Sequence, residues 1–280
     1  DIFKARQHNL PVARERALCG GLLSAHRRDA APAVEDDLAQ PGKQPARHDI
    51  AERPERQRGR ADIAADRQRR KQRRLRDADA RLAQKIADLL SWCEETQVEV
   101  VTLWMLSTDN FKRSPEEIET LIEVIGGIVD DLTARNRWNI KAVGALDVLP
   151  EPLATKLASL AGCADSKLQV NVAVGYGGRR EIVDAVKGFL GEEAKAGRTL
   201  EEAAADLDMD SIARHLYTAG QPDPDLLIRT SGEQRLGGFL LWQSALSEFY
   251  FCEAYWPEFR RVDFLRALRD YSLRHRRLGR

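Results

Sequence analysis

Length, composition and charge limit what this chain can be. It has 280 residues with 44 basic and 44 acidic side chains, so its formal net charge is zero and gives the whole chain no attraction for nucleic acid. No apolar run approaches the roughly 18 residues of a membrane-spanning helix, and the basic-then-apolar order of a signal peptide is missing. The four cysteines lack paired metal spacing, so we expect a cytoplasmic protein.

Residues 1–82 differ in composition from the rest of the chain. They contain a single aromatic residue, Phe3, and are rich in Arg, Ala, Asp, Gln and Pro. Such a segment buries too little apolar surface to offset an ordering entropy of about 1–2 kcal/mol per residue. We therefore expect two parts, a disordered or irregular extension over residues 1–82 and a globular domain over residues 83–280.

The Arg-rich run from Arg53 to Arg76 leaves one alternative open, a nucleic-acid-binding arm. Runs of this kind bind phosphate backbones without sequence preference. The run has no aromatic side chains on which bases could stack, and Asp62 and Asp66 dilute its charge. We favour a solvated tail; a binding arm would instead give salt-dependent retention on DNA that disappears when residues 1–82 are removed.

From Ala83 onward, segments of helical periodicity alternate with short apolar runs. Helices are expected at Ala83–Glu95, Ser114 to about Arg135, Pro150–Ala161, Arg179–Ala194 and Val262–Arg277. Strands are expected at Val98–Leu106, Asn139–Leu146, Leu168–Tyr176, Leu226–Ile228, Phe239–Gln243 and Phe249–Phe251. This alternation is typical of βαβ units, so we predict an α/β fold with a central, mostly parallel sheet flanked by helices.

Polar side chains cluster around the strands expected after residue 225. They are Arg229, Ser231, Glu233, Arg235 and Glu248. Ligands of open α/β sheets bind beyond the carboxyl ends of the strands, where we expect these residues to lie. Arginine binds phosphate oxygens with two parallel hydrogen bonds, and a carboxylate can hold Mg²⁺ together with substrate phosphates. The pattern indicates a polyphosphorylated substrate; structural ion pairs Arg229–Glu233 and Arg235–Glu248 are the alternative.

A second polar loop, Ser107–Arg113, follows the strand expected at Val98–Leu106. It brings a hydroxyl, an amide, a cation and an aromatic ring together at a strand's carboxyl end. Ser, Asp and Asn also favour turns and helix caps for purely local reasons. The residues alone therefore leave both interpretations open.

The sequences of both loops resemble motifs of the cis-prenyltransferases, the undecaprenyl diphosphate synthase family. The resemblance rests on Asp-Leu-Leu-Ile-Arg-Thr-Ser-Gly-Glu-Gln-Arg at 225–235, Phe-Leu-Leu-Trp-Gln at 239–243, Ser-Glu-Phe-Tyr-Phe at 247–251 and Trp-Pro-Glu-Phe at 256–259. Leu-Ser-Thr-Asp-Asn-Phe-Lys-Arg at 106–113 and Gly-Tyr-Gly-Gly-Arg-Arg-Glu-Ile at 175–182 add to it. The resemblance spans about Ala83 to Gly279. The motif sequences are closest to those of short-chain actinobacterial members, which resemble Z-farnesyl diphosphate synthase.

The resemblance implies a reaction. The family condenses isopentenyl diphosphate with an allylic diphosphate, here geranyl or farnesyl diphosphate, and releases pyrophosphate as a cis double bond forms. Mg²⁺ is the implied cofactor, and a homodimer with transient contact to a membrane surface is the implied assembly. The catalytic residue implied in the first loop is Asn110, and Glu248 is the implied metal ligand. The implied substrate-binding residues are Ser107, Thr108, Asp109, Phe111, Arg113, Arg229, Ser231, Arg235 and Gly237.

The amino-terminal part departs from the family pattern. Members begin with a strand and Asp-Gly-Asn-Arg-Arg-Trp, whose aspartate binds Mg²⁺, and we expect the domain over residues 83–280 to lack both. The nearest match to the motif is Asp66 within 63–71, which is the second catalytic candidate beside Asn110. One hypothesis is that residues before about 83 are translated out of frame, which resequencing of the gene would test. A non-catalytic partner subunit is the alternative function, although such subunits usually lose residues that match Arg229, Arg235 and Glu248.

Overall fold

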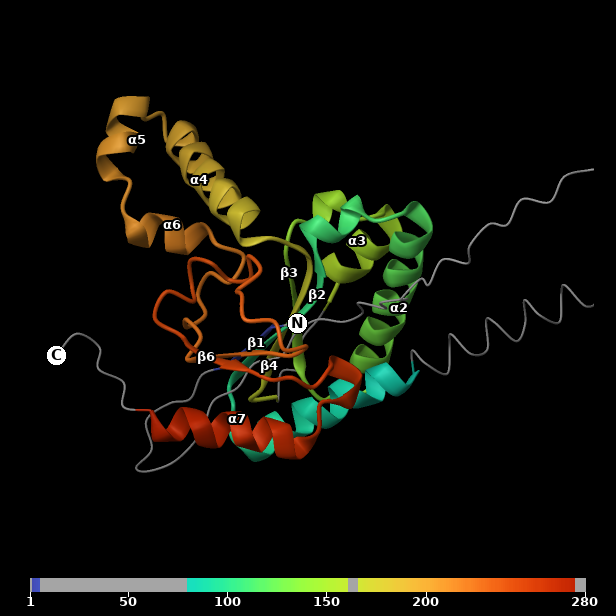
Figure 1. The fold of residues 1–280 in the computed structure, drawn as a ribbon. Helices are drawn as coiled ribbons and strands as arrows, with labels where there is room; N and C mark the ends of the chain where they lie inside the picture. Colours follow the sequence, from blue (N-terminus) through green and yellow to red (C-terminus); the bar gives the residue numbers. More distant parts are fainter. Residues whose placement is uncertain (1, 6–79, 161–165, 275–280) are drawn as a thin grey trace, which may run out of the picture. The chain divides into compact units, whose positions relative to one another are not determined.

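A computed structural model describes residues 2–5, 80–160 and 166–274 of the chain. A six-stranded sheet with the order β3-β4-β2-β1-β5-β6 forms its centre (Figure 1). The strands are β1 (Ile2–Ala5), β2 (Val100–Ser107), β3 (Asn139–Val143), β4 (Gln169–Tyr176), β5 (Leu226–Arg229) and β6 (Glu248–Phe251). Strands β3, β4 and β2 pair in parallel, as do β5 and β6. The predicted α/β fold with a mostly parallel sheet is confirmed.

Helices follow the strands in the predicted order. One helix covers residues 80–95. The others are α2 (Pro115–Ala134), α3 (Glu151–Ala158), α4 (Gly178–Lys195), α5 (Leu200–Asp206), α6 (Met209–His215) and α7 (Arg261–Leu273). Short 3₁₀ helices lie at η1 (Thr108–Lys112), η2 (Leu146–Val148) and η3 (Trp256–Glu258). None of the helices in the described ranges combines the length and the apolar character needed to cross a bilayer.

Burial on both faces explains why the two central parallel strands are mostly apolar. Val101 on β2 and Val170, Val172 and Val174 on β4 are fully buried. The helix over residues 80–95 packs beside α7, where the rings of Trp92 and Phe264 lie 6.2 Å apart. These contacts hold the sheet rigidly beneath the loops at its edges.

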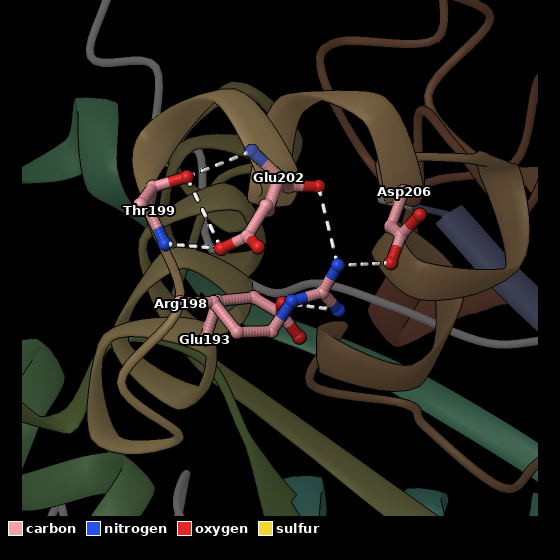
Figure 2. A network of polar contacts seen from close by, with 5 residues as sticks. All are labelled: Glu193, Arg198, Thr199, Glu202 and Asp206. Atoms are coloured by element: carbon pink, nitrogen blue, oxygen red, sulfur yellow. Dashed lines mark hydrogen bonds and ion pairs between the residues drawn. The ribbon is translucent and has the colours of Figure 1, made fainter.

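Local sequence also determines where helices begin. The Thr199 hydroxyl accepts a hydrogen bond from the Glu202 N–H, and the Glu202 carboxylate accepts the Thr199 N–H at 2.8 Å, so a capping box starts α5. Beside it, Arg198 forms ion pairs with Glu193 at the end of α4 and with Asp206 at the end of α5 (Figure 2). This corner joins α4 to α5.

The strand predicted at Phe239–Gln243 was wrong, because this run lies in a turn. Gly237, Gly238 and Leu240 have φ values of 68°, 87° and 48°, which no strand accommodates. The run is nevertheless buried: Phe239 and Leu240 are fully shielded, and the Phe239 ring stacks on Trp104 at 4.9 Å. Its hydrophobicity serves packing within a turn instead of pairing in a sheet.

The amino-terminal end of the chain contributes a strand to the sheet. Ile2–Ala5 forms β1. It pairs antiparallel with both β2 and β5, so these two strands run in the same direction. Without a strand between them, β2 and β5 would each leave a row of backbone N–H and C=O groups unpaired. Residues 6–79, with Asp66 and the Arg-rich run, lie outside the described residues.

Candidate functional site

Three loops meet at one edge of the sheet. Because β2, β4 and β5 run in the same direction, their carboxyl ends lie at this edge. The Gly178 N–H after β4 donates a hydrogen bond of 2.8 Å to the Gly238 carbonyl in the loop after β5. A Cβ atom on Gly177 would collide with the hydroxyl of Thr108 in the loop after β2. The predicted placement of both polar loops beyond strand ends is therefore what the structure shows.

The loop after β5 holds two guanidinium groups on one carboxylate. Arg229, whose side chain is 8% exposed, pairs with one oxygen of Glu233 and also donates to the Arg235 carbonyl. Arg235, 71% exposed, pairs with the other oxygen of Glu233 at 2.9 Å. Two positive charges therefore share one negative charge, and the Arg229 Nε–H has no hydrogen-bond partner among the described residues. This arrangement can accept an anion with several oxygens.

The charge of Arg229 is secure at working pH. Burial lowers the pKa of Arg229, the Glu233 carboxylate raises it, and the net direction is downward. An arginine side chain starts from a pKa far above the working pH range, so it stays protonated despite this shift. A buried charge of this kind is costly unless it is paired, and Glu233 provides the pair.

Close approach of the backbone completes this part of the site. Gly237 adopts φ 68°, and a Cβ atom there would lie 2.9 Å from Arg229 Nη1 and 3.5 Å from Trp104. Ser231 also has a positive φ of 75°, and its N–H donates to the Ala254 carbonyl at 2.9 Å. Gly237 and Ser231 thus shape the loop around the guanidinium of Arg229.

The loop after β2 is fixed by Asn110. The side-chain oxygen Oδ1 of Asn110 accepts hydrogen bonds from the Ser107 N–H at 2.8 Å and from the Ser107 hydroxyl at 2.9 Å. The Asn110 N–H donates back to the Ser107 hydroxyl at 3.2 Å, so the local cap that the sequence left open as an alternative is present. The amide NH₂ of Asn110 donates to no group in the part of the chain that the structure describes, and it is available to a ligand.

The other residues of this loop divide into two groups. Asp109 pairs with Lys112 at 2.7 Å on the exposed surface, so its carboxylate is engaged away from the arginines. Phe111 packs partly buried against the core, and Arg113 is exposed. Thr108 lies against Gly177. The structure thus groups Ser107, Thr108 and Asn110 near the glycine loops.

Glu248 is not where the sequence analysis expected it. It pairs in register with Leu226 at the amino end of β5, whereas Arg229 pairs with Phe251 at the carboxyl end. The Glu248 carboxylate forms an ion pair of 2.7 Å with Arg274, so the expected alternative pair Arg235–Glu248 was wrong. The pair Arg229–Glu233 does form. Register in the sheet could not be read from the spacing of residues along the sequence.

The described residues do not fit a complete magnesium site at Glu248. No group of three or more His, Cys, Asp or Glu side chains that could hold a metal ion occurs in the described ranges. Mg²⁺ is bound by oxygen ligands, usually one or two carboxylates with substrate phosphates and water. Glu248 offers one carboxylate, and a guanidinium already occupies it. Asp66, the other proposed acidic residue, is outside the described residues.

Sequence reasoning missed a buried polar cluster beneath the loops. Glu181 in the first turn of α4 is fully buried and accepts hydrogen bonds from Tyr176, from Gln243 and from the Tyr217 N–H. A glutamate one turn into a helix, next to a buried strand, was the available signal. Its partners lie up to 62 residues away in sequence, so no local pattern could identify them.

Comparison with known proteins identifies close relatives. The family model described as "Putative undecaprenyl diphosphate synthase" matches residues 66–279. A (2Z,6E)-farnesyl diphosphate synthase of Thermobifida fusca is 61% identical over 199 residues, covering 70% of this chain and 78% of that protein. A short-chain Z-isoprenyl diphosphate synthase of Mycobacterium leprae is 56% identical over 202 residues, covering 70% and 76%.

Solved structures show the same similarity. Lavandulyl diphosphate synthase from Lavandula x intermedia, solved in complex with dimethylallyl diphosphate, has a TM-score of 0.63 and 32% identity over 71% of this chain and 87% of that one. A probable undecaprenyl diphosphate synthase from Campylobacter jejuni has a TM-score of 0.61 and 26% identity, covering 72% and 93%.

Proposed function

This chain belongs to the undecaprenyl diphosphate synthase family of cis-prenyltransferase enzymes, and from that premise we propose that it joins isopentenyl diphosphate to geranyl diphosphate. A ten-carbon allylic substrate and a five-carbon unit joined with cis geometry give (2Z,6E)-farnesyl diphosphate. This product is the one in the names of the relatives from Thermobifida fusca and Mycolicibacterium smegmatis. Farnesyl diphosphate is the second allylic substrate to test.

The observation that carries the proposal is the pair of arginines on Glu233. A diphosphate supplies several oxygens in one anion, which suits two guanidinium groups whose two positive charges share a single carboxylate. Arg229 is buried, whereas Arg235 is exposed and can turn from Glu233 toward a ligand. We assign the diphosphate of isopentenyl diphosphate to Arg229 and Arg235, with Ser231 and the backbone at Gly237 beside it.

In this proposal the loop after β2 lies beside the atoms of the two substrates that react. The allylic C–O bond breaks and leaves its electron pair on pyrophosphate, the C4 atom of isopentenyl diphosphate bonds to the allylic carbon, and C2 loses a proton. Charge develops on the departing oxygen, so positioned hydrogen-bond donors accelerate the step. Asn110 can provide such a donor through its free NH₂ group, with Ser107, Thr108, Phe111 and Arg113 around the substrates. Asp109, engaged with Lys112, has the weakest geometric support.

Mg²⁺ enters the proposal with the diphosphates. It would neutralise phosphate charge, and a chelator should therefore abolish turnover. The described residues do not make Glu248 a complete ligand set, so Glu248 contributes to metal binding only if Arg274 releases it. No observation favours the alternative of a non-catalytic partner subunit. Arg229 and Arg235 are present and paired on Glu233, and Asn110 lies in the loop after β2, as the proposed reaction requires.

The proposed assembly is a homodimer in the cytoplasm with transient contact to a membrane surface. Support for a homodimer comes from β6, an edge strand on which Phe249 and Phe251 stack at 6.2 Å while Phe251 is 40% exposed. An exposed apolar edge strand is a ready pairing surface. Sedimentation of the purified chain tests the dimer, and a single monomer species at micromolar concentration would contradict it.

The deciding experiment measures incorporation of radiolabelled isopentenyl diphosphate by the whole chain with Mg²⁺ and geranyl diphosphate. We expect a fifteen-carbon product that co-migrates with the 2Z,6E isomer, and loss of turnover with a chelator. Arg229→Lys should reduce kcat/KM by about 100-fold, because lysine cannot form two parallel hydrogen bonds to phosphate. Arg261→Lys on α7, an exposed arginine paired with Glu95, is the control. No product from either allylic diphosphate would overturn the proposal.

A further inference from the structure

A buried carboxylate lies directly beneath the substrate loops. Glu181 is fully shielded from solvent. One of its oxygens accepts the Tyr217 N–H at 3.0 Å and the Gln243 side-chain N–H at 3.0 Å, and the other accepts the Tyr176 hydroxyl. A buried charge without partners is very costly, and here three donors and the amino end of α4 stabilise it.

This carboxylate is connected to the loop after β5 at several points. The Tyr176 hydroxyl that donates to Glu181 also accepts the Leu240 N–H at 3.2 Å. Gln243 additionally donates to the Thr218 hydroxyl at 2.9 Å. The Gly178 N–H holds the Gly238 carbonyl at 2.8 Å. Residues 238–243 are thus bound to the end of β4 and the start of α4.

The next residue back along the chain is Gly237, whose backbone approaches Arg229. Any shift of residues 238–243 moves Gly237 relative to the Arg229 guanidinium, from which a Cβ atom at this position would be 2.9 Å away. The aromatic layer below reinforces this link, since Tyr176 contacts Phe239 edge to face at 5.5 Å. Apolar side chains in place of Glu181 and the Tyr176 hydroxyl could fill the same volume. They would form no hydrogen bonds, so they would not orient the backbone of residues 238–243.

The Tyr176 hydroxyl keeps its proton over the working pH range. Burial, and after it the charge of Glu181, raise the pKa of Tyr176 well above its usual value. Tyr176 therefore remains a phenol that donates its proton to the carboxylate and accepts from the Leu240 N–H at the same time. A phenylalanine at this position would lose both hydrogen bonds while keeping the ring.

We propose that Glu181 and Tyr176 are positioning residues for the diphosphate site: they fix the turn at 238–243 and so hold Gly237, Arg229 and Arg235 in one arrangement. The inference rests on the proposed function, because it assumes that the two arginines bind a diphosphate. Neither residue touches the substrate in this proposal. They act through the backbone of the loop.

The test measures binding of inorganic pyrophosphate to the full chain by titration calorimetry, together with KM for isopentenyl diphosphate and thermal melting. Glu181→Gln places an amide among donors, and Tyr176→Phe removes one oxygen atom. Each should weaken pyrophosphate binding about tenfold or more, since each loses a hydrogen bond to a charged group. KM should rise in parallel, with a smaller change in kcat.

Gln221→Ala is the matched control. Gln221 is partly buried and exchanges hydrogen bonds of 2.6 and 2.9 Å with the buried Asn171 on β4, and neither side chain bonds to the turn at 238–243. This variant should melt at a lower temperature and bind pyrophosphate as tightly as the unmodified chain. A general loss of stability would affect all three variants alike, so the contrast separates positioning from stability.

Each outcome decides the matter. Pyrophosphate binding unchanged in folded Glu181→Gln and Tyr176→Phe proteins would overturn the inference and leave the proposed function intact. If Glu181→Gln does not fold, Tyr176→Phe decides alone. If the unmodified chain binds no pyrophosphate, the proposed diphosphate site itself is wrong, and the inference falls with it.

Discussion

Close contact between a glycine and a buried arginine is the most constrained feature of the site. Gly237 and Gly197 both have positive φ angles, 68° and 75°, which favour glycine for the same backbone reason. They differ in their surroundings: Gly237 faces Arg229 and Trp104, whereas nothing lies within 4 Å of a Cβ atom at Gly197. The two positions therefore separate backbone strain from crowding of the site.

Alanine substitution at both glycines tests this difference. Each variant should lose about 1 kcal/mol of unfolding free energy through the unfavourable φ. Only Gly237→Ala should also weaken substrate binding, by about tenfold or more, because its Cβ atom displaces the Arg229 guanidinium. Melting curves and KM for isopentenyl diphosphate provide the two measurements. Equal KM values for the two variants would mean that Gly237 does not shape the site.

Asn110 allows a local cap to be separated from a role in chemistry. Its side-chain oxygen Oδ1 accepts the two hydrogen bonds from Ser107, and its side-chain NH₂ group is the donor that would face the substrate. Asn110→Asp keeps an oxygen acceptor for both Ser107 hydrogen bonds but replaces the donor with a negatively charged acceptor. We expect kcat to fall by about 100-fold or more with little change in melting temperature. A variant that retains turnover would assign Asn110 to loop structure alone.

At the scale of elements, the corner between α4 and α5 depends on polar contacts at its surface. Figure 2 shows Arg198 reaching Glu193 and Asp206 while Thr199 and Glu202 bond each other reciprocally. Exposed ion pairs usually contribute little. The capping box, which satisfies backbone N–H groups at the start of α5, is the more valuable part.

Thr199→Ala should therefore lower the free energy of unfolding by about 1 kcal/mol, because the Glu202 N–H loses its acceptor. Thr199→Ser retains the hydroxyl and should remain close to the unmodified chain. Chemical denaturation of the three proteins gives the comparison, and kcat should be the same in all of them since α5 supplies no residue of the proposed site. An alanine variant as stable as the serine variant would show that the cap is unimportant here.

The elements also show how far the sequence could predict this molecule. Strands β2 and β4 were predicted because each is a short segment dense in apolar residues, as strands buried on both faces are. The run Phe239–Gln243 has a similar apolar sequence, but Leu240 and the preceding Gly237 and Gly238 have positive φ angles. Hydrophobicity alone does not reveal such backbone angles. Glu248 was assigned to the wrong end of the sheet because register depends on pairing between strands. Glu181 was missed because its partners are distant in sequence.

At the scale of the whole molecule, many charged side chains on the surface of the described domain are joined in ion pairs. Several carboxylates serve as acceptors in these pairs. Asp184 accepts from the Tyr217 hydroxyl at 2.5 Å and from Arg180 at 2.6 Å. Asp263 accepts from Arg260 at the start of α7. Such pairs link the stability of the domain to pH.

The direction of this linkage follows from the pKa shifts. Burial alone would raise the pKa of Asp184, but hydrogen bonds from Tyr217 and Arg180 outweigh it and lower the pKa below the usual 3.8. Asp263 behaves in the same way: burial opposes, while hydrogen bonds from Arg260 lower its pKa below 3.8. A carboxyl group with a lowered pKa in the folded state binds protons more readily when unfolded, so stability rises with pH through this range.

We therefore expect an almost constant melting temperature from pH 7 down to about pH 5 and a steep fall below about pH 4, where these carboxylates must be protonated. Asp263→Asn should flatten part of the acid fall and lower stability at pH 7, because the uncharged amide keeps the shape of the side chain without the ion pair. Asp109→Asn, in an exposed pair with Lys112, is the control and should change neither. Scanning calorimetry across this pH range measures both effects. If Asp263→Asn and the unmodified chain lose the same stability between pH 5 and pH 3, the acid sensitivity arises elsewhere in the protein.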